Sequence, residues 1–108
     1  MSKMRSVMVS YTLKPECVAE NEALIREVLA DLERERPAGL SYSVSRLSDG
    51  VSFVHVSVSP EGVENPLMRV PAFQRYRDGI KDRVLAPPVR VEMLSLGLFD
   101  GITQAEVA

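Results

Sequence analysis

The single histidine, His55, is the only side chain of this sequence that titrates near neutral pH without a perturbing environment. It could act as a general base towards a phenol or a quinol. Aromatic side chains could wall a pocket for a flat aromatic ligand, with phenolic hydroxyls that fix its orientation. The candidates for such a pocket are Tyr11, Tyr42, Phe73 and Tyr76. The alternative for all of them is structural, as a hydrogen-bonded histidine and ordinary core packing.

Other reactive residue types offer less. Cys17 is the single cysteine, and one thiol with one histidine excludes an ordinary cysteine–histidine zinc site, so we expect no metal. We interpret Cys17 as a residue at the edge of the core. Asn65 precedes a proline and is interpreted as a helix cap rather than a ligand. Four arginines are interpreted as a solvated face, although one at a pocket mouth could hold an anionic group. They are Arg69, Arg75, Arg77 and Arg83.

Changes of hydrophobic period divide the chain into elements that could position these residues. Alternation predicts strands over 7–13, 40–47, 51–59 and 89–98. The helical period predicts a helix over 17–36, packed through Leu24, Val28 and Leu32, and a second helix that begins at Pro71 and ends before Ala86. The order β-α-β-β-α-β predicts a ferredoxin-like α+β fold, a four-stranded antiparallel sheet with two helices on one face. We expect a single domain over 1–108, with its core at about 5–99 and a C-terminal tail over 100–108.

The hairpin between 40–47 and 51–59 decides which face His55 occupies. A two-residue loop, Asp49 and Gly50, sets His55 across from Val44. A three-residue loop that includes Ser48 sets it across from Ser43 instead. We prefer the three-residue loop because it gathers one coherent apolar face, and His55 would then lie on the serine-rich face that should meet a partner subunit. That apolar face would hold Leu40, Tyr42, Val44, Val54, Val56 and Val58.

The last predicted strand carries apolar residues on both of its sides, which a strand with one wet face should not do. We therefore expect a homodimer through the sheet face away from the helices. A net charge of -2 does not favour binding to nucleic acid or to a membrane surface. The segment after the N-terminus alternates and lacks a long apolar stretch, so it predicts a strand rather than a signal peptide, and we expect a cytoplasmic protein. The two apolar sets are Val89, Val91 and Met93, and Leu94, Leu96 and Leu98.

Three segments carry a resemblance to a known family, VSYTLKPECVAENEALIREVLADL, PAGLSYSVSRLSDGVSFVHVSV and PAFQRYRDGIKDR. A strand that ends in Lys-Pro, an amphipathic helix, and Gly-Leu-x-Tyr before a hairpin resemble the antibiotic-biosynthesis-monooxygenase-like domains of the dimeric α+β-barrel superfamily. The resemblance runs over about 7–98. The chain departs from that group by having no tryptophan, and by the residues 67–70 at the place where a histidine commonly begins the second helix.

The resemblance implies a cofactor-independent monooxygenase acting on a small electron-rich aromatic, either a quinol or a polyketide-like compound. In such a reaction the substrate carbanion itself reduces dioxygen, so no cofactor is expected. Tyr76, Tyr42 and His55 are the catalytic candidates, and we expect Tyr76 to matter more than His55. The pocket should lie between the sheet and the second helix, walled by Tyr42, Phe73 and Tyr76. The alternative is a non-catalytic dimeric module that binds a small apolar ligand or a partner protein.

Overall fold

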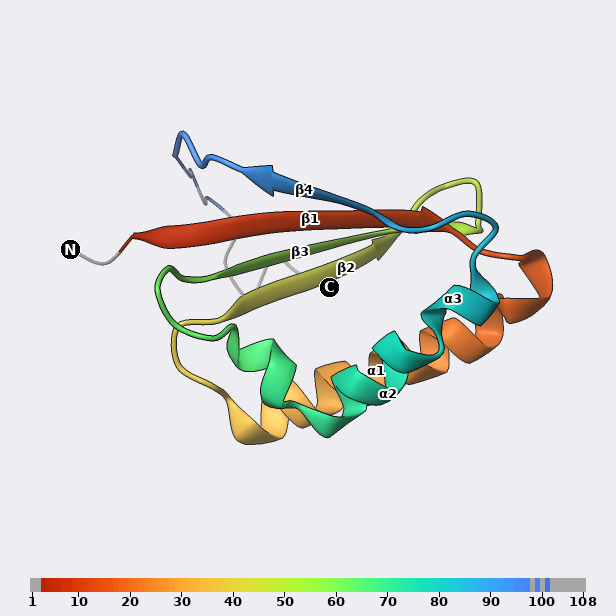
Figure 1. Ribbon diagram of the computed structural model, residues 1–108, viewed down its shortest axis with the longest axis horizontal. Coiled ribbons are helices and arrows are strands. Elements are labelled where there is room, and N and C mark those ends of the chain that lie inside the picture. Colours follow the sequence, from red (N-terminus) through yellow and green to blue (C-terminus); the bar gives the residue numbers. More distant parts are fainter. Residues whose placement is uncertain (1–2, 98, 100, 102–108) are drawn as a thin grey trace.

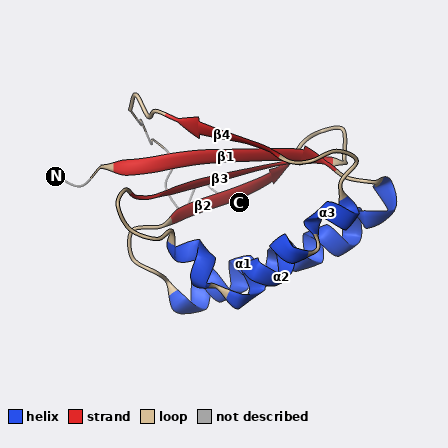
Figure 2. Cartoon of the chain, in the orientation of Figure 1, coloured by secondary structure: helices blue, strands red, loops and turns tan. Residues whose placement is uncertain are grey.

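Four antiparallel strands form an open sheet, and all of the helices lie on one of its faces (Figures 1 and 2). The computed structural model describes residues 3–97, 99 and 101. The sheet order is β2-β3-β1-β4, which is the predicted ferredoxin-like arrangement and confirms the fold class. The strands are β1 (Met4–Thr12), β2 (Ser41–Arg46), β3 (Ser52–Pro60) and β4 (Val89–Met93).

The first helix, α1 (Val18–Glu35), follows a short 3-10 turn, η1 (Pro15–Cys17), and covers the sheet through one stripe. Ile25 and Val28 are buried in that stripe, while Leu24 and Leu32 are partly buried against the same core. Arg36 ends the helix in a left-handed conformation, with its N–H donating to the Leu32 carbonyl. The predicted helix over 17–36 is therefore confirmed.

The second helical segment is interrupted. A 3-10 turn, η2 (Pro66–Arg69), precedes α2 (Pro71–Asp78), and α3 (Ile80–Arg83) follows after Gly79. Asn65 caps η2, because its side-chain oxygen accepts from the Leu67 N–H at 3.0 Å, as predicted. A Cβ at Gly79 would lie 2.7 Å from Nη1 of Arg83, so the break leaves room for that guanidinium.

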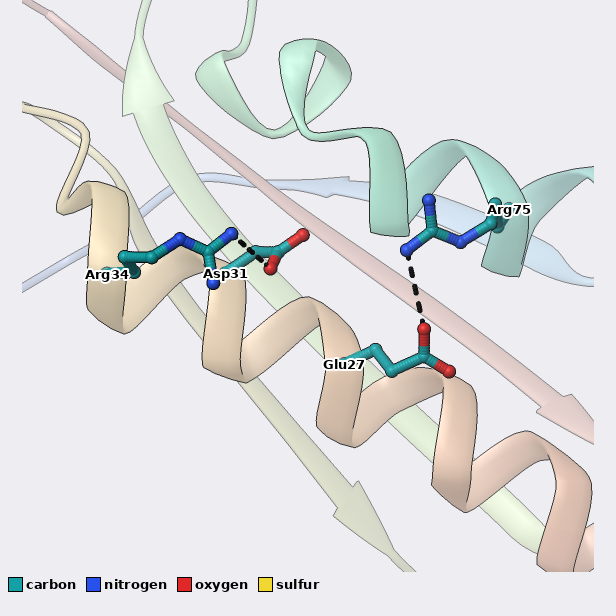
Figure 3. A network of polar contacts seen from close by, with 4 residues as sticks. All are labelled: Glu27, Asp31, Arg34 and Arg75. Carbon is teal, nitrogen blue, oxygen red and sulfur yellow. Dashed lines mark hydrogen bonds and ion pairs between the residues drawn. The ribbon is translucent and has the colours of Figure 1, made fainter.

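The helices α1 and α2 lie side by side and are joined at their exposed surface by an ion pair. Nη2 of Arg75 on α2 lies 3.3 Å from Oε1 of Glu27 on α1 (Figure 3). Arg34 pairs with Asp31 one turn earlier on α1, at 2.6 Å. Of the helices that the structure describes, none combines the length and the apolar character needed to cross a membrane.

The preferred hairpin register is wrong. Val44 pairs with His55, and Leu47 N donates to the Ser52 carbonyl at 2.8 Å, which leaves a four-residue loop over 48–51. The pairing is that of the two-residue alternative. Asp49 holds the loop, because its carboxylate accepts from the backbone N–H groups of residues 51 and 52. His55 therefore faces the helices, and the valines that the other register would have buried face away from them.

Apolar side chains cover the centre of the sheet face that carries no helix. Directly paired residues share a face, and Met8 of β1 pairs with Val56 on one side and Val91 on the other. The same pairing places further apolar residues on this open face, namely Val54, Val58, Val89 and Met93. The strand β4 ends at Met93, earlier than predicted, and Leu94 and Leu96 are exposed. Leu98 and most of the predicted tail over 100–108 lie outside the described residues.

Candidate functional site

A cavity of about 550 Å³ lies between the sheet and the second helical segment. Most of its wall is apolar, with side chains from β1, η2 and α2. Tyr42, His55 and Tyr76 bring polar atoms to the wall, and Phe73 meets the Tyr42 ring edge-on at a centroid distance of 6.4 Å. This is the kind of site that suits a flat, largely apolar ligand with a few oriented polar groups.

His55 lies at the centre of three tyrosine hydroxyls. Its Nε2 is 2.7 Å from the hydroxyl of Tyr11 and 3.1 Å from that of Tyr76. Its Nδ1 is 2.7 Å from the hydroxyl of Tyr42. The hydroxyl of Tyr76 donates to that of Tyr11 at 2.8 Å. Since these residues come from β1, β2, β3 and α2, the network ties the sheet to the second helical segment at one point.

Two further polar residues hold this network from behind the cavity wall. Asn21 on α1 is fully buried, and its Nδ2 donates to the hydroxyl of Tyr11 at 3.1 Å. Arg83 is 3% exposed, and its Nε donates to Oδ1 of Asn21 at 2.9 Å. Its Nη2 donates to the Tyr76 carbonyl at 2.7 Å, and the guanidinium carbon lies 5.4 Å from the centre of the Tyr76 ring. Among the described residues no carboxylate lies within ion-pair distance of Arg83, so its positive charge is stabilised only by hydrogen bonds to neutral acceptors.

The four central groups are neutral at physiological pH, and burial shifts the pKa of each further from 7. Removal from water lowers the pKa of His55 to about 4, so its imidazole is uncharged at pH 7. The same cause raises the pKa of Tyr11, Tyr42 and Tyr76 above that of a free phenol. Hydrogen bonds from Tyr76 and Asn21 and the charge of Arg83 oppose the increase at Tyr11. The network can therefore donate hydrogen bonds, but His55 is a weak base.

A count of protons assigns a direction to each hydrogen bond. The hydroxyl of Tyr11 accepts from Asn21 and from Tyr76, which uses both of its lone pairs. Its own proton therefore goes to Nε2 of His55, and the neutral imidazole carries its proton on Nδ1. Nδ1–H then donates to the oxygen of Tyr42, which leaves the proton of the Tyr42 hydroxyl for a ligand in the cavity.

The structure brings the predicted candidates together with one difference. The cavity is lined by Tyr42, Phe73, Tyr76 and His55. Tyr11 is buried behind the wall, and its hydroxyl is hydrogen-bonded to His55 and Tyr76. The prediction that His55 lies on the serine-rich face is wrong, because the hairpin register turns it towards the helices.

Of the remaining candidates, Arg83 departs most from its prediction. Arg83 does not belong to a solvated face, since it is almost fully buried. Arg77 and Asn65 are on the cavity wall, and Cys17 is half-buried at the start of α1, away from it. Within the part of the chain that the structure describes, no three histidine, cysteine or acidic side chains are grouped to hold a metal ion.

Three residues of the site, Asn21, Arg5 and Arg90, were not identified from the sequence, and a fourth, Arg83, was assigned to a solvated face. Asn21 occupies a stripe position of α1, four residues before Ile25, and a polar residue at that place was an available signal. Arg5 and Arg90 also line the cavity, from β1 and β4. Their faces follow only from the strand pairing, so no local pattern marks them. Arg83 could be placed only once the break at Gly79 was known.

Comparison with solved structures shows the same fold in proteins that are distant in sequence. A protein from Bacteroides thetaiotaomicron that carries the provisional name antibiotic biosynthesis monooxygenase superposes with a TM-score of 0.70, at 16% identity over 94% of this chain and 95% of that one. Rv0793 from Mycobacterium tuberculosis gives a TM-score of 0.69, at 16% identity over 91% and 100%. A protein from Nitrosomonas europaea with the same provisional name gives 0.68, at 14% identity over 89% and 93%.

At the level of sequence, no protein-family model matches the chain, and no curated protein matches it significantly. The resemblance inferred from the three sequence segments is thus confirmed by the fold, which is that of the antibiotic-biosynthesis-monooxygenase-like domains. Function has to be argued from the site.

Proposed function

We propose that this protein is a cofactor-independent monooxygenase that oxidises a small electron-rich aromatic, a quinol or a polyketide-like compound. The observation that carries the proposal is the cavity of about 550 Å³, whose largely apolar wall holds Tyr42, Tyr76 and His55 in one network and also includes three arginines. An apolar site excludes water from a reactive carbanion, and a few fixed donors can stabilise the charge that develops on the substrate.

In the proposed reaction the substrate releases an acidic proton to solvent, the activated C–H proton of an anthrone or the hydroxyl proton of a quinol, and the negative charge is delocalised between a ring carbon and a ring oxygen. That ring carbon reduces dioxygen by forming a C–O bond, and the resulting peroxide anion takes up a proton from solvent. Cleavage of the O–O bond with loss of water leaves a carbonyl, so that one oxygen atom enters the product and the other leaves as water. Because His55 is a weak base, the substrate must itself be acidic, as anthrones are.

By the proton count, Tyr42 is the residue that donates a hydrogen bond to the oxyanion forming on the substrate. Its hydroxyl accepts from His55 and keeps its own proton for the ring oxygen of the substrate. Tyr76 also lines the cavity, but its proton goes to Tyr11. The expectation that Tyr76 matters more than His55 stays a prediction, and between the two tyrosines of the wall the proton count favours Tyr42.

The test is oxygen consumption with a panel of anthrones and quinols, without added metal or flavin. Tyr42→Phe should lower turnover by roughly 10²–10³-fold, the usual effect of removing one oxyanion donor. Tyr76→Phe is the matched control, because it also removes one phenolic hydroxyl from the wall, and it should cost less. A larger loss at Tyr76 than at Tyr42 would contradict the assigned proton direction. No oxygen uptake by the unmodified protein with any compound would reject the monooxygenase.

A binding module is the second candidate, and the low pKa of His55 favours it. With a pKa of about 4, the neutral imidazole of His55 is a weak base, so the cavity is equipped to hold a ligand but not to remove a proton from one that is weakly acidic. In that case the same aromatic compounds should bind stoichiometrically and be recovered unchanged. Equilibrium binding measured beside oxygen uptake separates the two functions.

We also propose that two copies associate through the open face of the sheet. In support, β1, β3 and β4 present apolar side chains there, and no helix of the described chain covers them. Burial of such a face against a second copy removes apolar area from water, which is the main stabilising contribution in homodimers. Leu94 and Leu96, 86% and 96% exposed just beyond β4, add apolar surface that a partner could cover.

A further inference from the structure

The cavity wall carries three positive charges and, over the described residues, no negative one. Arg5 lines it from β1, Arg77 from α2 and Arg90 from β4. Arg83 adds a fourth positive charge behind the wall, almost fully buried and without a carboxylate partner in the described chain. The whole protein has a net charge of -2, so the excess of positive charge is local to this cavity.

Arg5 is the least satisfied of these groups. It is half-buried, and its Nε is a buried atom with no hydrogen-bond partner among the residues that the structure describes. A buried donor on a charged group that has no acceptor is unfavourable, and native structures rarely keep one without a reason. An acceptor supplied by a ligand in the cavity would satisfy it.

The other two wall arginines have weak partners. Nη1 of Arg77 donates to the thioether sulfur of Met68 at 3.2 Å, and sulfur is a poor acceptor. Nη2 of Arg90 lies 3.5 Å from a carboxylate oxygen of Glu92, and both side chains are more than half exposed. Three arginines away from the cavity are better paired, although Arg69 lies 3.9 Å from a carboxylate oxygen of Glu64. Arg34, Arg36 and Arg46 each lie 2.6–2.8 Å from a carboxylate oxygen.

We propose that the natural ligand of this cavity is a planar aromatic that carries a carboxylate, and that Arg5 binds the carboxylate. Arg77, and Arg90 opposite Val9, add positive charge elsewhere on the wall, which favours an anionic ligand over a neutral one. The planar fork of a guanidinium matches a carboxylate through two parallel hydrogen bonds. Identification of the cavity as the ligand site rests on the proposed function, whereas the preference for a negative charge does not depend on oxidation.

The strand positions separate the binding end of the ligand from its reacting end. Arg5 and Val9 point to the same face of β1, and Val9 pairs directly with His55. Four residues of strand place Arg5 about 13 Å from that position along β1. A carboxylate held by Arg5 would therefore leave the far side of the ring system near Tyr42 and Tyr76.

The test compares two fluorescent ligands of equal size that differ in charge, 2-naphthoate and its neutral amide, 2-naphthamide. Binding to the unmodified protein is measured by titration at low and at high salt. The carboxylate should bind roughly ten- to hundredfold more tightly than the amide, as charge-assisted hydrogen bonds allow. Added salt should weaken the carboxylate alone.

Variants then locate the charge. Arg5→Gln should reduce the preference for the carboxylate at least about tenfold. Arg75→Gln is the matched control, because it also removes one positive charge, but Arg75 points to Glu27 on α1 (Figure 3) and does not line the cavity. It should leave both affinities unchanged. If Arg5→Gln does not fold, the comparison of the two ligands on the unmodified protein still decides the matter.

Equal affinities for the two ligands, or binding of neither, would overturn the inference. An equal loss of carboxylate preference in Arg5→Gln and Arg75→Gln would overturn it too, since it would show a general effect of net charge. Oxygen uptake is measured separately. A preference for the carboxylate without uptake would reject only the monooxygenase, and uptake with neutral quinols without that preference would reject only the inference.

Discussion

Removal of the Tyr11 hydroxyl tests the buried network at its centre. That hydroxyl accepts from Asn21 at 3.1 Å and from Tyr76 at 2.8 Å, and it donates to His55 at 2.7 Å. In Tyr11→Phe the ring remains stacked on Phe53, at a centroid distance of 5.7 Å. The proton of Tyr76 can turn to Nε2 of His55, which is 3.1 Å away, so the imidazole keeps a donor.

Asn21 is the residue that loses its partner in this variant. It is fully buried, so the N–H of its amide that pointed at Tyr11 is left without an acceptor. One orphaned buried donor lowers the free energy of unfolding by about 1–3 kcal/mol. With a urea m-value of about 2 kcal/mol per M, the midpoint of denaturation should fall by about 0.5–1.5 M and the m-value should not change.

Tyr76→Phe is the matched variant for this measurement. It also removes one buried phenolic hydroxyl, but the hydroxyl of Tyr11 keeps both Asn21 and His55 as partners, so no donor is orphaned. Its loss should stay near the net value of one hydrogen bond, about 0.5–1.5 kcal/mol. Urea denaturation followed by circular dichroism compares the two. A loss in Tyr76→Phe equal to or larger than that in Tyr11→Phe would refute the proton count.

Three further predictions concern pH, packing and assembly. Burial lowers the pKa of His55 to about 4 from 6.5, so between these pH values the unfolded chain binds a proton that the native state does not. The free energy of unfolding should therefore fall by roughly 3 kcal/mol as the pH drops through this window. A His55→Asn variant with the same pH dependence would contradict the assignment to His55. Leu13 is fully buried and Leu85 is 64% exposed, so Leu13→Ala should cost ~2–5 kcal/mol in urea denaturation and Leu85→Ala less than ~0.5 kcal/mol; similar costs would mean that the core has been misplaced. Val56→Asp sets a charge in the middle of the open sheet face and should turn a dimer into a monomer in sedimentation, whereas a monomeric unmodified protein at micromolar concentration would reject the dimer.

The element order could be predicted from the sequence because the periods of two and 3.6 residues are local properties. Each helix and strand has enough apolar residues at its own spacing to identify it, and turn residues such as Pro37 and Gly50 separate them. The last strand was predicted too long. Leu94 and Leu96 continue an apolar pattern, but the partner strand β1 pairs with β4 only from Ser10 back to Ser6.

The hairpin register was predicted incorrectly because only the apolar residues of the two strands were taken into account. Gathering the valines of β3 with Tyr42 and Val44 gives the better apolar face, yet the structure buries His55 there. An imidazole with partners for both ring nitrogens can be buried without an unsatisfied polar atom, and those partners come from separate elements. A pattern confined to one hairpin does not contain that information. The resulting apolar face without helices is what supports association with a second copy.

The candidate site was predicted in its aromatic part and missed in its charged part. Tyr42, Phe73 and Tyr76 share faces that follow from the period of their own elements, so their meeting could be anticipated. Arg83 was assigned to solvent because arginine is rarely buried without an acidic partner. Its acceptors are a backbone carbonyl and an amide side chain, and neither is visible as an ion pair in the sequence.

The gap between α2 and α3 has a consequence for any attempt to make this protein more robust. By helix propensity alone, alanine is more favourable than glycine by ~1 kcal/mol, so Gly79→Ala would be an obvious stabilising substitution. Here a methyl group would lie 2.7 Å from Nη1 of Arg83, and the same guanidinium donates through Nη2 to the Tyr76 carbonyl and through Nε to Asn21. The glycine at the break thus leaves space for the guanidinium of Arg83, and a Gly79→Ala substitution would displace the side chain that supports Tyr76 and Asn21.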